Sequence, residues 1–430
     1  MTKVLIVLYY WPPAGGPGVQ RWLKFVKYLP DFGYEPIVFA PENPFYPLQD
    51  AELLKEVPNQ VKVVKYPIRE PYTLAKIFNK RKTQTISSGI ISEKDKQGFM
   101  EKLLLFIRGN LFIPDARVGW VKPATKYLES YLKKNNITKV ITTGPPHSLH
   151  LIGLALKRKL GIAWYADFRD PWTHIGYHKD LFLLPASQKR HQRLETTVLQ
   201  QADAIITTSF GTAKEFKKKT KRPIRVITNG YDGNIKKDVF RKKDKFILAH
   251  VGSLLTNRNP KNLWVALAEL RQENKNFLEY FELQLSGKVS EEVINSIQKE
   301  GLSDCLNNKG YVSAEKAFSF MCEASLLSLI EINSAQHASI VPGKLFAYLK
   351  AQRPILAIGP KNWDVNKIFE QVGYKPAFEY TEKAKIKAYI RDQFNNFLQG
   401  KTDFNSTDEI KAFHRRNLTQ NLAFFLNDQV

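Results

Sequence analysis

Cysteine is scarce in this chain, and long apolar runs are missing. Only Cys305 and Cys322 occur among 430 residues; this is too few for a disulfide framework, and a reduced, intracellular setting fits them. No segment approaches the ~18–20 apolar residues of a membrane-spanning helix. The opening MTKVLIVLYY has one lysine, a short apolar core and no small-residue cleavage site. It predicts a first strand, not a signal peptide, and we expect a cytoplasmic protein.

Motifs that hold metals or activate nucleophiles are missing as well. No group of His, Cys, Asp and Glu has metal-ligand spacing. The sequence contains no Asp-x-Asp, no Walker loop and no nucleophile elbow. Nothing in it therefore requires a metal or another cofactor.

Acidic side chains are few relative to basic ones. The chain has 41 Asp and Glu against 65 Lys and Arg, a formal net charge of +24. Nucleic acid, an anionic membrane face or a phosphate-bearing substrate could each explain this balance. The basic residues are spread along the chain, and no nucleic-acid-binding module is visible. We therefore expect no nucleic acid partner, and charge does not choose between the other two.

Short apolar runs alternate with helical patterns along most of the chain. The first series of predicted strands is 4–10, 36–40, 61–66, 139–144, 164–168, 204–209 and 225–230. A second series follows the charged, turn-rich segment 232–245, at 246–252, 281–287, 309–312, 325–332 and 354–359. Strands alternating with helices predict parallel sheets covered on both faces. The length and the break predict two Rossmann-like domains in an α/β fold.

A glycine-rich loop follows the first predicted strand. It contains Gly15, Gly16 and Gly18, and an amphipathic pattern with Arg21 near its head begins there. Ligands bind beyond the carboxyl ends of parallel strands, so this position favours close backbone approach to a phosphate or sugar at a helix N-terminus. A bare tight turn is the alternative. GGPG is not GxGxxG, and Pro17 lacks an N–H donor, so a dinucleotide site is not expected.

Polar residues also follow two later strands of the first domain. His147 lies in a Pro-restricted turn after 139–144, before a helical pattern; it is either structural or catalytic. Asp167, Arg169 and Asp170 follow the strand at 164–168. Burying these charges unpaired would be costly. They form either a structural ion pair or the polar wall of a site.

The second domain has a comparable arrangement. HVGSLLTNRNPKNLW combines a predicted strand, a glycine turn, and Arg258 and Lys261 before a helix. A glycine turn with two cations at a helix start suits a diphosphate. Lys344 adds a third cation at another helix start. Each alone could be a solvated surface charge.

The segment LLLFIRGNLFI, residues 103–113, has nine apolar residues around Arg108. We interpret it as a core helix and strand of the first domain. The alternative is an interfacial element that meets a lipid-linked acceptor, with nearby lysines on anionic head groups.

Taken in order, these segments resemble the GT-B glycosyltransferases, and among them the large retaining family 4. The resemblance extends over nearly the whole chain. It rests on the segments GGPGVQR, TTGPPHS, ADFRDPW, ADAIITTS, VITNGYD, VGSL…RNPKNLW and PGKLFAYLKAQRPILAIGP. It is closest to the branch that builds bacterial surface polysaccharides such as capsule or O-antigen. It implies two Rossmann-like domains whose parallel sheets face each other across a cleft, residues 1–233 and 234–406. It also implies that the terminal segment 407–430 crosses back to the first domain.

The resemblance also implies a reaction and a site. A sugar would pass from a nucleotide-sugar donor to a glycan or lipid-linked acceptor with retention and without metal, the protein lying in the cytoplasm and on the inner membrane face. The implied donor-binding residues are Gly252, Ser253, Arg258, Lys261, Gly287, Glu331, Gly343 and Lys344. The sugar and acceptor side would hold His147, Asp167, Arg169 and Asp170, with the loop of Gly15, Gly16, Gly18 and Arg21 facing the cleft.

One departure from the family pattern affects the donor site. Family 4 members usually carry two glutamates separated by seven residues, and here these positions are Ser339 and Ala347. Glu331, at the end of a predicted strand, could substitute in part. A lost charged hydrogen bond costs ~1.5–3 kcal/mol. This departure motivates a second interpretation, a non-catalytic GT-B protein that binds sugar or partners a transferase.

Overall fold

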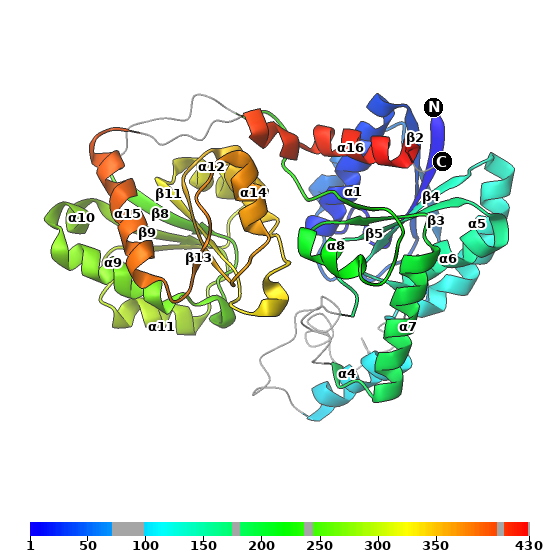
Figure 1. Cartoon of the computed structure of the whole chain (residues 1–430), viewed down its shortest axis with the longest axis horizontal. Coiled ribbons are helices and arrows are strands. Elements are labelled where there is room, and N and C mark those ends of the chain that lie inside the picture. Colours follow the sequence, from blue (N-terminus) through cyan, green and yellow to red (C-terminus); the bar gives the residue numbers. More distant parts are fainter. Residues whose placement is uncertain (71–98, 174–180, 236–243, 402–407, 429–430) are drawn as a thin grey trace. The chain divides into compact units, whose positions relative to one another are not determined.

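The computed structural model describes residues 1–70, 99–173, 181–235, 244–401 and 408–428. The chain forms two compact units. Unit 1 comprises Met1–Thr228 together with Arg415–Val430, and unit 2 comprises Asn229–His414. Each unit is an α/β structure with helices on both sides of its sheet (Figure 1).

Unit 1 is built on a seven-stranded parallel sheet with the order β3-β2-β1-β4-β5-β6-β7. Its inner strands are continuous apolar runs buried on both faces; in β1, Val4 to Val7 are all fully buried, as expected for a parallel sheet between two helical layers. The strands are β1 (Thr2–Val7), β2 (Tyr34–Pro41), β3 (Lys62–Tyr66), β4 (Lys139–Gly144), β5 (Ala163–Phe168), β6 (Ala204–Thr207) and β7 (Ile224–Val226).

The helices of unit 1 cover this sheet with amphipathic faces. In the first of them, Val19, Trp22, Leu23 and Val26 recur at helical spacing and are buried. The helices are α1 (Pro17–Tyr28), α4 (Phe99–Leu111), α5 (Val118–Asn135), α6 (Ser148–Leu160), α7 (Pro185–Gln201), α8 (Phe210–Phe216) and α16 (Arg415–Asn427). Short 3-10 helices occupy Leu29–Phe32 and Ala51–Glu56.

Helix α16 comes from the far end of the chain and packs on α1. Leu418, Leu422 and Leu426 of α16 are buried in the core of unit 1. The carbonyl of Leu426 accepts hydrogen bonds from Lys139 Nζ at 2.7 Å and Tyr165 Oη at 2.9 Å. The C-terminal helix is therefore part of the core of the first unit.

Unit 2 has a six-stranded parallel sheet with the order β10-β9-β8-β11-β12-β13. Its strands are β8 (Phe246–Val251), β9 (Phe281–Ser286), β10 (Leu306–Gly310), β11 (Leu326–Ile330), β12 (Ile355–Gly359) and β13 (Phe378–Glu379). Its α-helices are α9 (Lys261–Glu273), α10 (Lys275–Tyr280), α11 (Glu291–Lys299), α12 (Ala314–Glu323), α13 (Lys344–Ala351), α14 (Val365–Val372) and α15 (Lys383–Leu398). Its 3-10 helices are Thr256–Arg258, Ala335–His337 and Asp408–Phe413.

The expected α/β class is confirmed, and all twelve predicted strands are present in two parallel sheets. The interpretation of 103–113 as a core helix followed by a strand is wrong. Residues Phe99–Leu111 form α4, and no strand follows it before α5. Leu103, Leu104, Phe106 and Leu111 are exposed. Leu105, Gly109 and Ile113 are the buried residues of this run.

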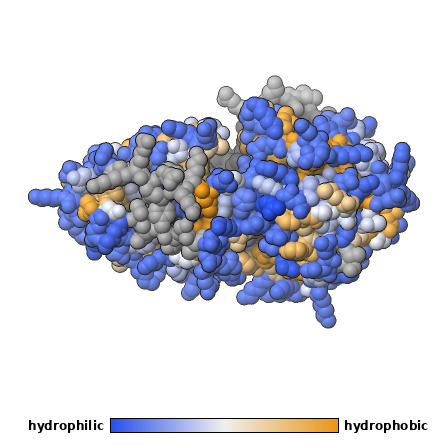
Figure 2. All heavy atoms as spheres, turned by 90° about the horizontal axis from the view of Figure 1, so that it is seen from above, coloured by the Kyte–Doolittle hydropathy of each residue, from blue (hydrophilic) through white to orange (hydrophobic). Residues whose placement is uncertain are grey.

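The face shown in Figure 2 is mostly hydrophilic, with apolar residues in small groups. Among the helices that the structure describes, none is long and apolar enough to cross a bilayer.

Candidate functional site

In unit 1 the strand order reverses between β1 and β4, because β1 pairs with β2 on one side and β4 on the other. Such a switch point, at the carboxyl ends of the strands, is where open parallel sheets bind ligands. The glycine loop follows β1, and His147 follows β4. The predicted residues of unit 1 therefore lie at the expected edge of their sheet.

The glycine loop is held against a neighbouring segment and begins α1. Gly15 N donates to Leu48 O at 3.0 Å, and Asp50 N donates to Pro13 O at 2.8 Å. Gly16 has a φ of 102°, a backbone conformation that favours glycine. A side chain at Gly18 would collide with the guanidinium of Arg169. The close approach at this loop is therefore made in part by a protein side chain.

Asp167 is fully buried and fully engaged. Its Oδ1 accepts from Arg21 Nη2 at 2.9 Å, and its Oδ2 accepts from Trp22 Nε1 at 2.9 Å and Thr143 Oγ1 at 2.7 Å. Arg21, only 1% exposed, also donates to Thr228 O at 2.9 Å. A buried carboxylate with three donors is a structural anchor, so the ion-pair alternative describes Asp167 and Arg21.

Arg169 and Asp170 have a different environment. Arg169 donates from its backbone N to Gly144 O at 2.9 Å and from Nη2 to Pro145 O. Burial lowers the pKa of Arg169 and raises the pKa of Asp170, while the charge of Arg169 opposes the rise. Within the described part of the chain, the Asp170 carboxylate has no hydrogen-bond donor. Asp170 is thus the carboxylate of this edge that is available to a ligand.

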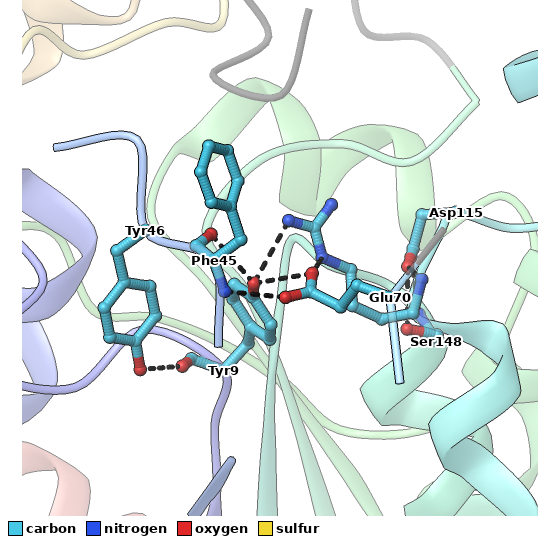
Figure 3. Close-up of polar contacts among 7 residues, drawn as sticks. Tyr9, Phe45, Tyr46, Glu70, Asp115 and Ser148 are labelled. Atoms are coloured by element: carbon cyan, nitrogen blue, oxygen red, sulfur yellow. Dashed lines mark hydrogen bonds and ion pairs between the residues drawn. The ribbon is translucent and has the colours of Figure 1, made fainter. Parts of the chain in front are cut away.

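His147 occupies the N-cap position of α6, and its ring stacks on Trp172 with centroids 4.9 Å apart. Its side chain is 5% exposed. The α6 N-terminus is capped by Asp115, which accepts from Ser148 N and Ser148 Oγ, both at 2.8 Å (Figure 3). The helix start is thus held by a carboxylate 33 residues earlier in the chain.

Sequence reasoning missed a second buried polar group at this edge of the sheet. Tyr9 Oη donates to Glu70 Oε1 at 2.7 Å, and Phe45 N donates to Glu70 Oε2 at 2.7 Å (Figure 3). Arg117 Nε lies 3.2 Å from Glu70 Oε1. Tyr9 lies two residues after the end of β1, so its place near the sheet edge could be predicted from the sequence. Glu70 and Arg117 belong to no motif that would have identified them.

In unit 2 the strand order reverses between β8 and β11, and the predicted donor residues surround this point. Gly252 directly follows β8 and has a φ of 117°. A Cβ at Gly252 would lie 3.0 Å from Lys344 Nζ. Gly287 has a φ of 129°, and a Cβ there would collide with the carbonyl group of Gly252. Gly252 therefore leaves room for the Lys344 ammonium, and Gly287 leaves room for the backbone of Gly252.

Lys344, the first residue of α13, is partly buried beside His250. His250 Nδ1 lies 3.0 Å from Ser328 O, which can only accept, so Nδ1 carries the proton and Nε2 accepts from Lys344 Nζ at 3.0 Å. Burial, reinforced by the charge of Arg258, lowers the pKa of Lys344 to about 7, although Glu331 opposes this shift. Burial also holds the pKa of His250 well below its usual value.

Arg258 and Glu331 form an ion pair at the same edge. Glu331 Oε1 accepts from Arg258 Nη2 at 2.9 Å, Arg258 Nε at 3.1 Å and Ile332 N at 2.8 Å. Within the described residues, Glu331 Oε2 and Arg258 Nη1 have no hydrogen-bond partner. Glu331 is 1% exposed and the Arg258 side chain 27% exposed. The pair therefore presents one acceptor and one donor to a ligand.

The remaining predicted donor residues do not join this cluster by side-chain contacts. Lys261 begins α9 with an exposed side chain, and Ser253 and Gly343 are also exposed. His250, Tyr348 and Tyr380 were missed. Tyr380 Oη donates to Glu331 O at 2.8 Å, and Tyr348 Oη accepts from Val251 N at 3.0 Å. His250 and Tyr348 lie within segments that the resemblance used, but neither they nor Tyr380 were singled out, because each acts through a contact distant in the chain.

Groups of three or more metal-ligating side chains are not found among the described residues. The polar groups at the two sheet edges are cations, hydroxyls and backbone N–H groups, together with two hydrogen-bond acceptors, the Asp170 carboxylate and one free oxygen of Glu331. This chemistry suits phosphate and sugar hydroxyl groups.

The family model of glycosyltransferase family 4 matches residues 89–234. The matched part includes His147, Asp167, Arg169 and Asp170. Comparison with curated protein sequences gives no match.

Solved structures resemble the chain over its whole length. Sucrose-phosphate synthase from Thermosynechococcus elongatus has a TM-score of 0.61 and 12% identity, covering 100% of this chain and 99% of that chain. The Anabaena protein HepE, in complex with UDP, has a TM-score of 0.60 and 14% identity, covering 100% of both chains. The lipopolysaccharide outer core galactosyltransferase WaaB has a TM-score of 0.57 and 14% identity, covering 99% of this chain and 100% of that chain.

These likenesses, together with the family model, confirm the resemblance to GT-B glycosyltransferases of the family 4 type. At such low identities the structural likeness establishes the GT-B fold alone. The activity has to be argued from the site.

Proposed function

We propose that the protein is a retaining glycosyltransferase that uses a nucleotide sugar and needs no metal. Its acceptor is a glycan or a lipid-linked glycan of bacterial surface polysaccharide assembly. The observation that carries this proposal is the group of Lys344, Arg258 and Glu331 at the strand-order reversal of unit 2. The Anabaena relative binds UDP and UDP-glucose, which favours a uridine donor here.

The cations of unit 2 have a direct role in such a reaction. When the glycosidic C–O bond breaks, negative charge develops on the departing diphosphate, and preorganised cations stabilise it. Lys344 Nζ retains N–H groups beyond its bond to His250, and Arg258 Nη1 is available. The free Oε2 of Glu331 can accept a hydrogen bond from a ribose or sugar hydroxyl. Glu331 could in this way take over part of the role of the two family glutamates, whose positions are Ser339 and Ala347 here.

In unit 1 the available carboxylate is Asp170, beside Arg169. We assign Asp170 and Arg169 to the sugar and acceptor side, where a carboxylate can orient the attacking hydroxyl. His147 and Asp167 support that side from within the core. The proton can pass to Asp170 or to the departing phosphate.

The proposal includes contact with an anionic membrane, through an apolar surface of unit 1. Leu103, Leu104, Phe106 and Leu111 of α4 are exposed together with Phe182 and Leu184. Asn110 joins the two segments, donating to Phe182 O at 3.1 Å and accepting from Leu184 N at 2.8 Å. Clustered exposed apolar residues mark interaction surfaces.

The charges around this apolar surface favour a lipid bilayer as its partner. Lys102 on α4 and Lys189, Arg190 and Arg193 on α7 are exposed. Cations flanking apolar side chains are typical of an interfacial element on anionic lipid. Such contact would bring a lipid-linked acceptor to unit 1.

The first test is nucleotide binding by calorimetry and thermal shift, with UDP, GDP, ADP, TDP and CDP in EDTA. We expect saturable binding by one nucleotide class, weakened about tenfold or more in Arg258→Ala and in Lys261→Ala, since a charge-assisted bond contributes ~1.5–3 kcal/mol. Lys350→Met, on α13 but directed to Phe318, is the control. Folded protein that binds none of the five would favour the non-catalytic interpretation.

A further inference from the structure

A groove in unit 1 lies apart from the residues of the proposed transfer reaction. It has a volume of about 770 Å³ and lies between the edge strand β3 and helix α5. Specific ligand sites usually have volumes of ~300–1,000 Å³. Its lining residues are Lys62, Tyr66, Pro123, Lys126, Tyr127, Ser130, Tyr131, Lys134 and Asn135.

The α5 side of the groove consists of two rows of side chains. Residues four apart lie above one another on a helix. One row is Pro123, Tyr127, Tyr131 and Asn135, and the next is Lys126, Ser130 and Lys134. At 1.5 Å per residue, the two tyrosines lie about 6 Å apart along the helix axis, beside two lysines about 12 Å apart.

The aromatic row continues onto the sheet and is firmly supported. The Tyr66 and Tyr127 rings have centroids 4.9 Å apart, and those of Tyr127 and Tyr131 are 6.1 Å apart. Tyr127 also stacks on Phe39, which is fully buried. Three tyrosine rings are therefore held in a fixed series along the groove, each packed on the next.

The groove is cationic. None of its lining residues is acidic. In the part of the chain that the structure describes, Lys62, Lys126 and Lys134 have no carboxylate partner; Lys62 Nζ lies over the Tyr131 ring, 5.3 Å from its centroid. By contrast, the adjacent Lys133 pairs with Glu129 at 3.6 Å.

The floor of the groove also has an unmet hydrogen-bonding group. The Tyr131 hydroxyl oxygen is buried and has no hydrogen-bond partner among the described residues. A buried hydroxyl without a partner is unfavourable, and a hydrogen-bonding ligand group that reached it would remove that cost. Ser130 and Asn135 add further polar groups at the rim.

We propose that this groove binds an acidic oligosaccharide, with sugar rings against Tyr66, Tyr127 and Tyr131 and carboxylate or phosphate groups on the three lysines. Aromatic rings and hydroxyl-bonding groups suit sugars, and three cations without acids select an anionic one. The choice of a glycan among anionic polymers rests on the proposed function. In that setting, the groove would hold the polymer while the transfer site acts on it.

The test measures binding by calorimetry, without nucleotide, to hexagalacturonate, a heparin-derived hexasaccharide and neutral maltohexaose. We expect at least one acidic hexamer to bind in preference to maltohexaose, with affinity falling as salt rises. Replacement of Lys62, Lys126 and Lys134 by Gln together should weaken this binding at least tenfold, and Tyr127→Leu should also weaken it. Lys133→Gln should leave it unchanged, and all variants should retain UDP binding.

Three results would overturn the proposal. Folded wild-type protein could bind neither acidic hexamer, or the triple variant could bind as well as wild type. Alternatively, the triple variant could lose binding to phosphatidylglycerol vesicles or duplex DNA while no acidic hexamer binds, which would identify another anionic partner. Because the assay omits the donor, failure of the transferase proposal would show separately, in the nucleotide screen.

Discussion

Lys344 gives the sharpest test of the nucleotide site, because its charge depends on pH near neutrality. Its pKa of about 7 results from burial beside Gly252 and His250, next to Arg258. A lysine binds diphosphate strongly only when protonated. With this pKa, about 90% of Lys344 is charged at pH 6 and about 10% at pH 8. Its contribution to UDP affinity should fall about tenfold between these values.

The measurement is calorimetry of UDP binding at pH 6, 7 and 8 for wild type and Lys344→Met, with Lys350→Met as control. The terminal phosphate itself titrates near pH 6 and strengthens binding as pH rises, so only the ratio of wild type to variant isolates the lysine. Bound diphosphate should raise the pKa of Lys344, so wild type should take up about half a proton at pH 7. Buffers of different ionisation enthalpy measure this uptake.

The free protein supplies an independent check on the same group. The pKa of Lys344 is lower in the folded state than the ~10.4 of an exposed lysine. The unfolded chain therefore binds more protons between about pH 7 and pH 10, and stability should rise with pH there. Lys344→Met should raise Tm most below pH 7, because there Lys344 is charged in the folded protein and burying that charge carries its full cost in stability. If the variant matches wild type in both pH profiles, the reasoning about Lys344 is refuted.

Three further predictions concern unit 1. Asp167→Asn should destabilise the protein by ~3–5 kcal/mol in urea denaturation, because it leaves Arg21 buried without its charge partner. The control Asp31→Asn breaks the exposed pair with Arg416 and should cost less than ~1 kcal/mol. Equal losses of stability in the two variants would contradict the assignment of Asp167 as a buried anchor. Asp170→Asn should lower turnover at least tenfold with Tm preserved, and full activity would remove Asp170 from the acceptor side. Leu104→Asp with Leu111→Asp should abolish flotation with phosphatidylglycerol vesicles, whereas Leu278→Asp, an exposed position of unit 2, should not; retained flotation would exclude the α4 surface.

The sheets were predictable because their strands are short, continuous apolar runs. All twelve runs of the two predicted series became strands, since burial between two helical layers suits short apolar runs. Short helices such as α8, α10 and α14 have six to eight residues, which carry little periodicity for a sequence pattern to reveal. The helix α4 was misread because its apolar residues suggested burial, whereas four of them face outward.

The site was only partly predictable. Strand ends identified Gly252, Glu331 and Asp170 as candidates, because parallel strands place their carboxyl ends at one edge. The partner of each charge was not readable. Arg21 pairs with Asp167 across 146 residues, and Arg258 with Glu331 across 73. The sequence left Asp167 open between an anchor and a site wall, and only these contacts decide it.

The placement of α16 in unit 1 has a consequence for synthesis of the chain. The last helix of unit 1 is separated from the rest of that unit by all of unit 2. At ~5–20 residues per second, translation of the intervening part takes on the order of 10–40 seconds. During that time α1 lacks its partner helix, and Lys139 and Tyr165 lack the carbonyl that they bind in the finished protein. Unit 1 therefore starts first on the ribosome and finishes last, and until α16 is made, the apolar surface that α16 covers in the finished protein is open to solvent.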